Sequence, residues 1–149
     1  RRQRFGLRLA RGVGGEQRRV VVLHHPGAGP RGDDHRPVVG EQGQLVRRHL
    51  ETSDEFYLVA VTRADDAIQQ ADAQRPDCIL LDVMMPGRDG WELLARLKGY
   101  PETSSIPVVI SSILRERDLA RALGASEVLV KPFAAAQLIA VLRSVTGAR

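Results

Sequence analysis

The sequence predicts a doubly wound α/β domain built on a five-stranded parallel sheet. Short apolar runs alternate along the chain with segments that have helical periodicity. The runs are continuously apolar rather than alternating, which is typical of strands buried on both faces of a parallel sheet. Ligands of such folds bind at the carboxyl ends of the strands, so polar residues at those ends are the candidates for function.

The N-terminal region differs from the rest of the chain. Residues 1–19 are rich in Arg and Gly, and we expect them to be disordered. A domain is expected over residues 20–146. Its first part, residues 20–37, is irregular because the turn-forming residues 24–32 follow the first apolar run.

Strands are expected at the apolar runs and helices where apolar residues recur at helical spacing. Pro76 ends the second helix because proline cannot continue it, and Gly124 closes the fourth as a C-cap. In the first helix, the residues expected near one face are Val38, Val39, Gln42, Leu45, Val46, His49 and Leu50. The expected strands are 19–23, 56–61, 78–81, 107–111 and 128–130, and the expected helices are 38–52, 64–74, 90–98, 116–123 and 134–145.

Composition limits the class of protein. The 149 residues and the apolar fraction of 43% suit one globular domain. Cys78 is the single cysteine, so a disulfide framework is excluded and a reducing, cytoplasmic setting is expected. No apolar run approaches the roughly 18 residues that a membrane span needs, and no membrane partner is expected.

The net charge of +4 belongs to the N-terminal segment. Residues 1–36 carry nine arginines against Glu16, Asp33 and Asp34, whereas the remaining residues carry slightly more acidic than basic side chains. The domain therefore lacks the positive field that nucleic acid binding needs. A nucleic acid tether through the arginine segment is a minor alternative, and it predicts binding that is lost at high salt and on removal of residues 1–19.

Three expected strands end in groups that suit phosphoryl chemistry. Asp82 ends the third strand, Ser111-Ser112 end the fourth, and Lys131 follows the fifth. A carboxylate can attack phosphorus, while a lysine and a metal ion neutralise the charge on the transferring oxygens. Mg²⁺ prefers oxygen ligands, and the adjacent pair Asp33-Asp34 is the natural supplier of carboxylates.

The residues around these strand ends resemble the receiver domain of two-component response regulators. The matching segments are PDCILLDVMMPGRDGWELL (76–94), IPVVISS (106–112) and LGASEVLVKPF (123–133). The resemblance covers about residues 45 to 145 and implies a flavodoxin-like fold. It also implies a protein that is not a conventional enzyme, and that receives a phosphoryl group from a sensor histidine kinase or a phosphotransfer protein.

The resemblance implies a role for each site residue. Asp82 matches the phosphoryl acceptor, Ser112 the switch hydroxyl, and Lys131 the lysine that pairs with the phosphoryl group. Asp33, Asp34 and Asp82 would hold Mg²⁺, together with the backbone carbonyl of Met84. The Lys131-Pro132 bond is cis in the family.

The acidic region is where the sequence departs from the family. Family members run the first strand directly into the acidic pair, but here His24-His25 follow the strand and Asp33-Asp34 come later. In one account residues 24–32 bulge and the acidic pair still reaches the pocket. In the other the pocket is broken, and the chain is a degenerate receiver that binds proteins without being phosphorylated. Imidazole suits softer metals than Mg²⁺, so the histidines are poor substitutes.

Residues beside the site predict slow chemistry. Ile113 is bulky where the family often has a small residue, and neither Met84 nor Leu114 has a side chain that could orient a water. We therefore expect slow entry of the phosphoryl group and a long-lived phosphorylated Asp82.

The output switch is also expected to be reduced. Val128 stands where many receivers carry a rotating aromatic side chain. Output would then depend on Ser112 and helix 116–123, which would change a face for an output partner or for a phosphorylation-dependent homodimer.

Overall fold

The described residues of this computed structural model are 18–23, 41–53, 55–61, 64–83, 90–113 and 115–147. Strands and helices alternate along them, as the sequence predicts. The strands are β1 (Arg18–Leu23), β2 (Phe56–Val61), β3 (Cys78–Asp82), β4 (Val108–Ser112) and β5 (Glu127–Val130). The helices are α1 (Glu41–Glu51), α2 (Ala64–Gln74), α3 (Gly90–Gly99), α4 (Arg117–Ala122) and α5 (Ala135–Thr146).

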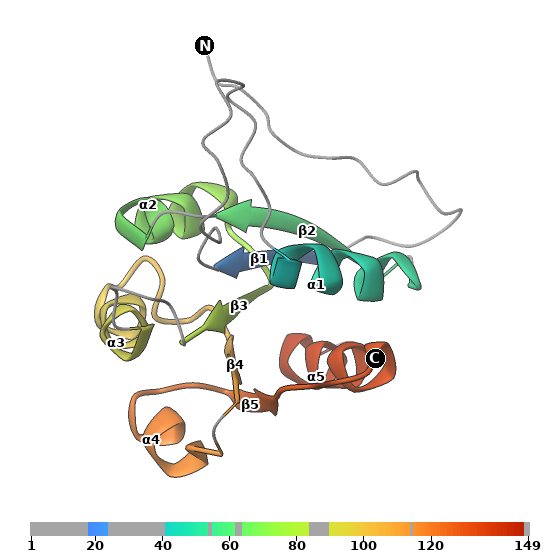
Figure 1. Cartoon of the computed structure of the whole chain (residues 1–149). Coiled ribbons are helices and arrows are strands. Elements are labelled where there is room, and N and C mark those ends of the chain that lie inside the picture. The colour runs from blue at the N-terminus through green and yellow to red at the C-terminus, as the bar shows by residue number, and fades with distance from the viewer. Residues whose placement is uncertain are drawn as a thin grey trace.

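The described strands form one sheet in the order β2-β1-β3-β4-β5, and every neighbouring pair is parallel. Helices α1 and α5 cover one face, and α2, α3 and α4 cover the other (Figure 1). The order reverses between β1 and β3, which is the switch point where doubly wound sheets bind ligands. The predicted α/β class and parallel sheet are confirmed.

Two apolar cores follow from this layering. On the α2–α4 face, Ile79, Leu81 and Ile110 pack with residues such as Leu94. On the α1–α5 face, the alternate strand residues Leu80 and Val109 pack with residues of the two helices. Because β3 and β4 are buried on both faces, their sequences are apolar throughout until Asp82 and Ser111-Ser112.

Two details of the predicted helices are corrected. Leu45 was expected on the buried face of the first helix, but its side chain is 47% exposed, while Val46 and Leu50 are buried. Leu123 is the C-cap of this helix, and Gly124 is the residue after it. Gly124 has a positive φ of 96°, which glycine adopts more readily than other residues do.

The N-terminal predictions fall mostly outside the described residues. Arg18 and Arg19 belong to β1, and the rest of the segment 1–19 is not described. Among the described helices, none is long and apolar enough to cross a membrane.

Candidate functional site

Asp82 is the last residue of β3 and lies at the carboxyl edge of the sheet. It pairs in register with Ser111 of β4, and the Val83 N–H donates to the Ser111 carbonyl at 3.4 Å. The strand before it is buried, and the Asp82 side chain is only 13% exposed. A carboxylate so poorly hydrated requires a compensating partner.

Lys131 supplies that partner. It follows β5, and its Nζ lies 2.9 Å from Oδ2 of Asp82, across 49 positions of sequence. The Lys131 side chain is 16% exposed, so water screens this ion pair far less than it would a surface pair. The Lys131 N–H donates to the Ser112 carbonyl at 2.9 Å, which fixes the start of the segment after β5 against β4.

Ser112 ends β4, in register with Val130 of β5. Ser112 is 1% exposed. Successive strand residues point to opposite faces, so Ser111 lies on the same side as Asp82, with which it is in register, and Ser112 on the other side. Adjacent strands thus bring the three predicted residues Asp82, Ser112 and Lys131 to one edge of the sheet, and the Lys131-Pro132 bond is cis as the resemblance implies.

The structure also identifies Gly90, which sequence reasoning did not select. A Cβ at Gly90 would lie 2.4 Å from the Val83 Cα and 2.9 Å from the Val83 carbonyl oxygen. The first residue of α3 therefore meets the backbone directly after Asp82. The only sequence signal was a glycine in the first turn of a helix, where most other residues favour the helix more.

The proposed metal ligands are only partly described. Asp33, Asp34 and Met84 lie outside the described residues. Within the described ranges no group of three or more His, Cys, Asp or Glu side chains could hold a metal ion. Asp82 offers a carboxylate at the open end of β3, and an all-oxygen donor set is what Mg²⁺ requires. The described part of the site therefore fits one ligand of a Mg²⁺ ion.

Two other conspicuous residues have structural roles. Cys78 is fully buried, and burial raises the pKa of its thiol from 9.0 to about 12, so the thiol is unreactive. Trp91 is partly buried and packs against the core of the α2–α4 face.

Comparison with known proteins agrees with this geometry. The family model described as the response regulator receiver domain matches residues 33–143. The chain is 34% identical over 103 residues to the phosphate regulon transcriptional regulatory protein PhoB of Rhizobium meliloti, covering 67% of this chain and 45% of that protein. It is 43% identical over 96 residues to the response regulator PleD of Caulobacter vibrioides, covering 62% of this chain and 21% of that protein. The chain therefore spans less than half the length of these relatives.

Solved structures share the fold. The receiver domain of the Pseudomonas aeruginosa sensor histidine kinase PA1611, described with a magnesium ion in its active site cleft, superposes with a TM-score of 0.69 and 20% identity over 89% of this chain and 100% of that one. The Vibrio cholerae chemotaxis response regulator CheY4 superposes with a TM-score of 0.66 and 22% identity over 87% of this chain and 99% of that one. With the family match over most of its length, the chain belongs to the response regulator receiver domain family of two-component signalling.

Proposed function

We propose that this receiver domain accepts a phosphoryl group on Asp82. The observation that carries the proposal is the 2.9 Å contact between Lys131 Nζ and Asp82 Oδ2 at the carboxyl edge of the sheet, beside Ser112. A structural ion pair could lie anywhere on the surface. This one lies at the end of a central strand, where folds of this class bind ligands.

The reaction is an in-line displacement at phosphorus. An oxygen of Asp82 attacks the phosphoryl group, an O–P bond forms, and the bond from phosphorus to the donor's nitrogen or oxygen breaks with its electron pair on the donor. Lys131 pairs with the carboxylate beforehand and with a phosphoryl oxygen afterwards, so it offsets the developing charge without moving far. The Ser112 hydroxyl would donate to another phosphoryl oxygen and thereby couple β4 to phosphorylation.

Bound Mg²⁺ would supply further neutralisation of the phosphoryl oxygens. Its proposed ligands are Asp82, the acidic pair Asp33-Asp34 and the Met84 carbonyl. The receiver domain of PA1611 is described with magnesium in its active site cleft, which supports an oxygen-ligated Mg²⁺ here.

The partners follow from this chemistry. The donor would be a phosphorylated histidine of a sensor kinase or a phosphotransfer protein in the cytoplasm. The output would be a changed face around α4 and α5 for a downstream protein or a second copy of this chain. Neither Met84 nor Leu114 has a side chain that could orient a water, so hydrolysis of phosphorylated Asp82 would be slow. The chain would then act as a signal carrier rather than as a conventional enzyme.

The second candidate is a degenerate receiver that binds a protein partner without phosphorylation. The displaced acidic pair in the sequence favours it. Intact-mass measurement after incubation with acetyl phosphate and Mg²⁺ separates the two, with Asp82→Asn and a chelator as controls. We expect one phosphoryl increment in the wild type and none with Asp82→Asn or without Mg²⁺. No increment in the wild type would favour the binding module.

A further inference from the structure

The segment that carries Lys131 to the site is short and is held at its start, in its middle and at its end. It runs from Lys131 to Ala134 between β5 and α5. At its start the Lys131 N–H donates to the Ser112 carbonyl at 2.9 Å, and at its end the Ala134 N–H donates to Oε1 of Gln137 at 2.8 Å. Between these, Phe133 packs against the apolar core of the α1–α5 face. The position of the Phe133 ring therefore affects the position of Lys131, two residues earlier.

His49 is the aromatic neighbour of Phe133. It lies in the last turn of α1, and the centroids of the two rings are 6.0 Å apart with their planes tilted by 56°. This spacing lies in the range of favourable aromatic pairs, and the tilt lies between the stacked and the edge-to-face arrangement. Nε2 of His49 is buried and forms no hydrogen bond with the described residues. A buried nitrogen without a partner destabilises the fold, so the ring contact is what this side chain contributes.

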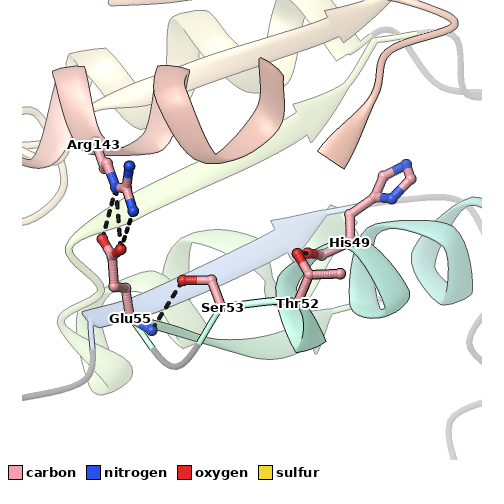
Figure 2. A network of polar contacts seen from close by, with 5 residues as sticks. All are labelled: His49, Thr52, Ser53, Glu55 and Arg143. Atoms are coloured by element: carbon pink, nitrogen blue, oxygen red, sulfur yellow. Dashed lines mark hydrogen bonds and ion pairs between the residues drawn. The ribbon is translucent and has the colours of Figure 1, made fainter. Parts of the chain in front are cut away.

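The segment 131–134 and helix α5 each contact α1 or the turn that follows it. Near its C-terminal end, Arg143 forms an ion pair with Glu55 in which its Nε donates to Glu55 Oε2 at 2.9 Å (Figure 2). His49 and Glu55 point to the same side of the α1–β2 segment (Figure 2). The ion pair is exposed and lies far along α5 from Lys131, whereas the His49–Phe133 contact lies just before the helix begins. The two contacts therefore provide a matched comparison.

We propose that His49 is a positioning residue for Lys131. Its ring holds Phe133, and thereby the segment 131–134, at the place where Lys131 Nζ reaches the Asp82 carboxylate. This inference rests on the proposed phosphoryl transfer to Asp82.

The test compares three substitutions. His49→Phe keeps the ring and removes the orphaned nitrogen, His49→Leu keeps similar bulk without a ring, and Arg143→Met removes the distant ion pair. The rate of phosphorylation by acetyl phosphate is measured for each protein, together with its unfolding by urea. A ring pair of this geometry contributes enough to slow the His49→Leu protein about two- to tenfold. His49→Phe and Arg143→Met should keep the wild-type rate.

Equal rates in His49→Leu, His49→Phe and the wild type would overturn the proposal. An equally large loss in Arg143→Met would also overturn it, because general loosening of α5 would then be the cause.

A second measurement does not depend on phosphorylation. Hydrogen exchange of the Lys131 amide, which donates to Ser112, reports how firmly the segment is held. Faster exchange in His49→Leu alone supports the positioning role, whether or not the wild type is phosphorylated. A wild type that takes no phosphoryl group would reject the proposed function, but not the positioning role. Equal protection in all four proteins rejects the positioning role.

Discussion

A Cβ atom on Gly90 would lie 2.4 Å from the Cα of Val83, so α3 begins against the residue after Asp82 with no space for a side chain. The clash is with backbone, which cannot rotate away as a flexible side chain can. Gly90 thus fixes how closely α3 approaches the end of β3, and through it the surroundings of the Asp82 carboxylate.

Gly90→Ala is expected to destabilise the domain and to impair phosphorylation. Separating α3 from β3 should lower the free energy of unfolding by about 1–3 kcal/mol, as overpacking of a close contact does. Gly99→Ala, at the other end of α3, is the control because a Cβ there meets no atom within 4 Å. Urea unfolding and the acetyl phosphate reaction check both variants. Equal stability of the two variants would show that the Val83 contact imposes no constraint.

Lys131→Met should slow phosphorylation of Asp82, on the order of a hundredfold, because a preorganised charge is lost from the site of charge development. The same substitution should strengthen Mg²⁺ binding, since a cation 2.9 Å from the carboxylate no longer competes for it. Lys131→Arg keeps the charge but not the shape, so its phosphorylation rate and Mg²⁺ affinity should lie between those of the wild type and Lys131→Met. Mg²⁺ titration measures the affinity and the rate of mass increase measures phosphorylation, and the two should change in opposite directions. A fall in both quantities would instead indicate a collapsed site.

Ser112→Ala should leave Asp82 able to accept a phosphoryl group but should uncouple α4 from it. Ser112 ends β4 five residues before α4 begins, and the segment between carries Ile113, which is 59% exposed. Ser111→Ala is the comparison, because Ser111 is also buried and lies on the Asp82 side of the sheet, so a loss of coupling in that variant instead would assign the switch to Ser111. Hydrogen exchange of α4 with and without phosphorylation is the measurement. A phosphorylation-dependent change that persists in Ser112→Ala would remove the switch role.

The buried thiol of Cys78 is expected to make the domain less stable at alkaline pH. Burial raises the pKa of Cys78 from 9.0 to about 12, so between these values the native state retains a proton that the unfolded state has lost. The native state then binds more protons, and stability falls as pH rises, by about 1.4 kcal/mol per pH unit from this group. The difference in unfolding free energy between wild type and Cys78→Ala should therefore shrink from about pH 8 to about pH 10. A difference that stays constant would contradict the buried, protonated thiol.

The sequence predicts those site residues that lie at the ends of strands. Asp82, Ser112 and Lys131 each terminate or follow an apolar run, and parallel topology alone brings such ends to one edge. The role of Gly90 was not predicted, because it depends on how closely α3 approaches β3, and no local sequence pattern encodes that distance.

Two other features were not predicted. Leu45 is one position from Val46 and five from Leu50, so the helical rotation places it off the face that those two share, and it is exposed. The pairing of Glu55 with Arg143 joins residues 88 positions apart, and nothing in either neighbourhood specifies the partner.

Asp82 itself is proposed to carry the phosphoryl group. Borohydride reduces an acyl phosphate on aspartate to homoserine, and peptide mass mapping then locates the modified residue. After incubation with acetyl phosphate and Mg²⁺, we expect homoserine at position 82 and nowhere else. Homoserine at another carboxylate, or none in a protein that has gained a phosphoryl group, would contradict it.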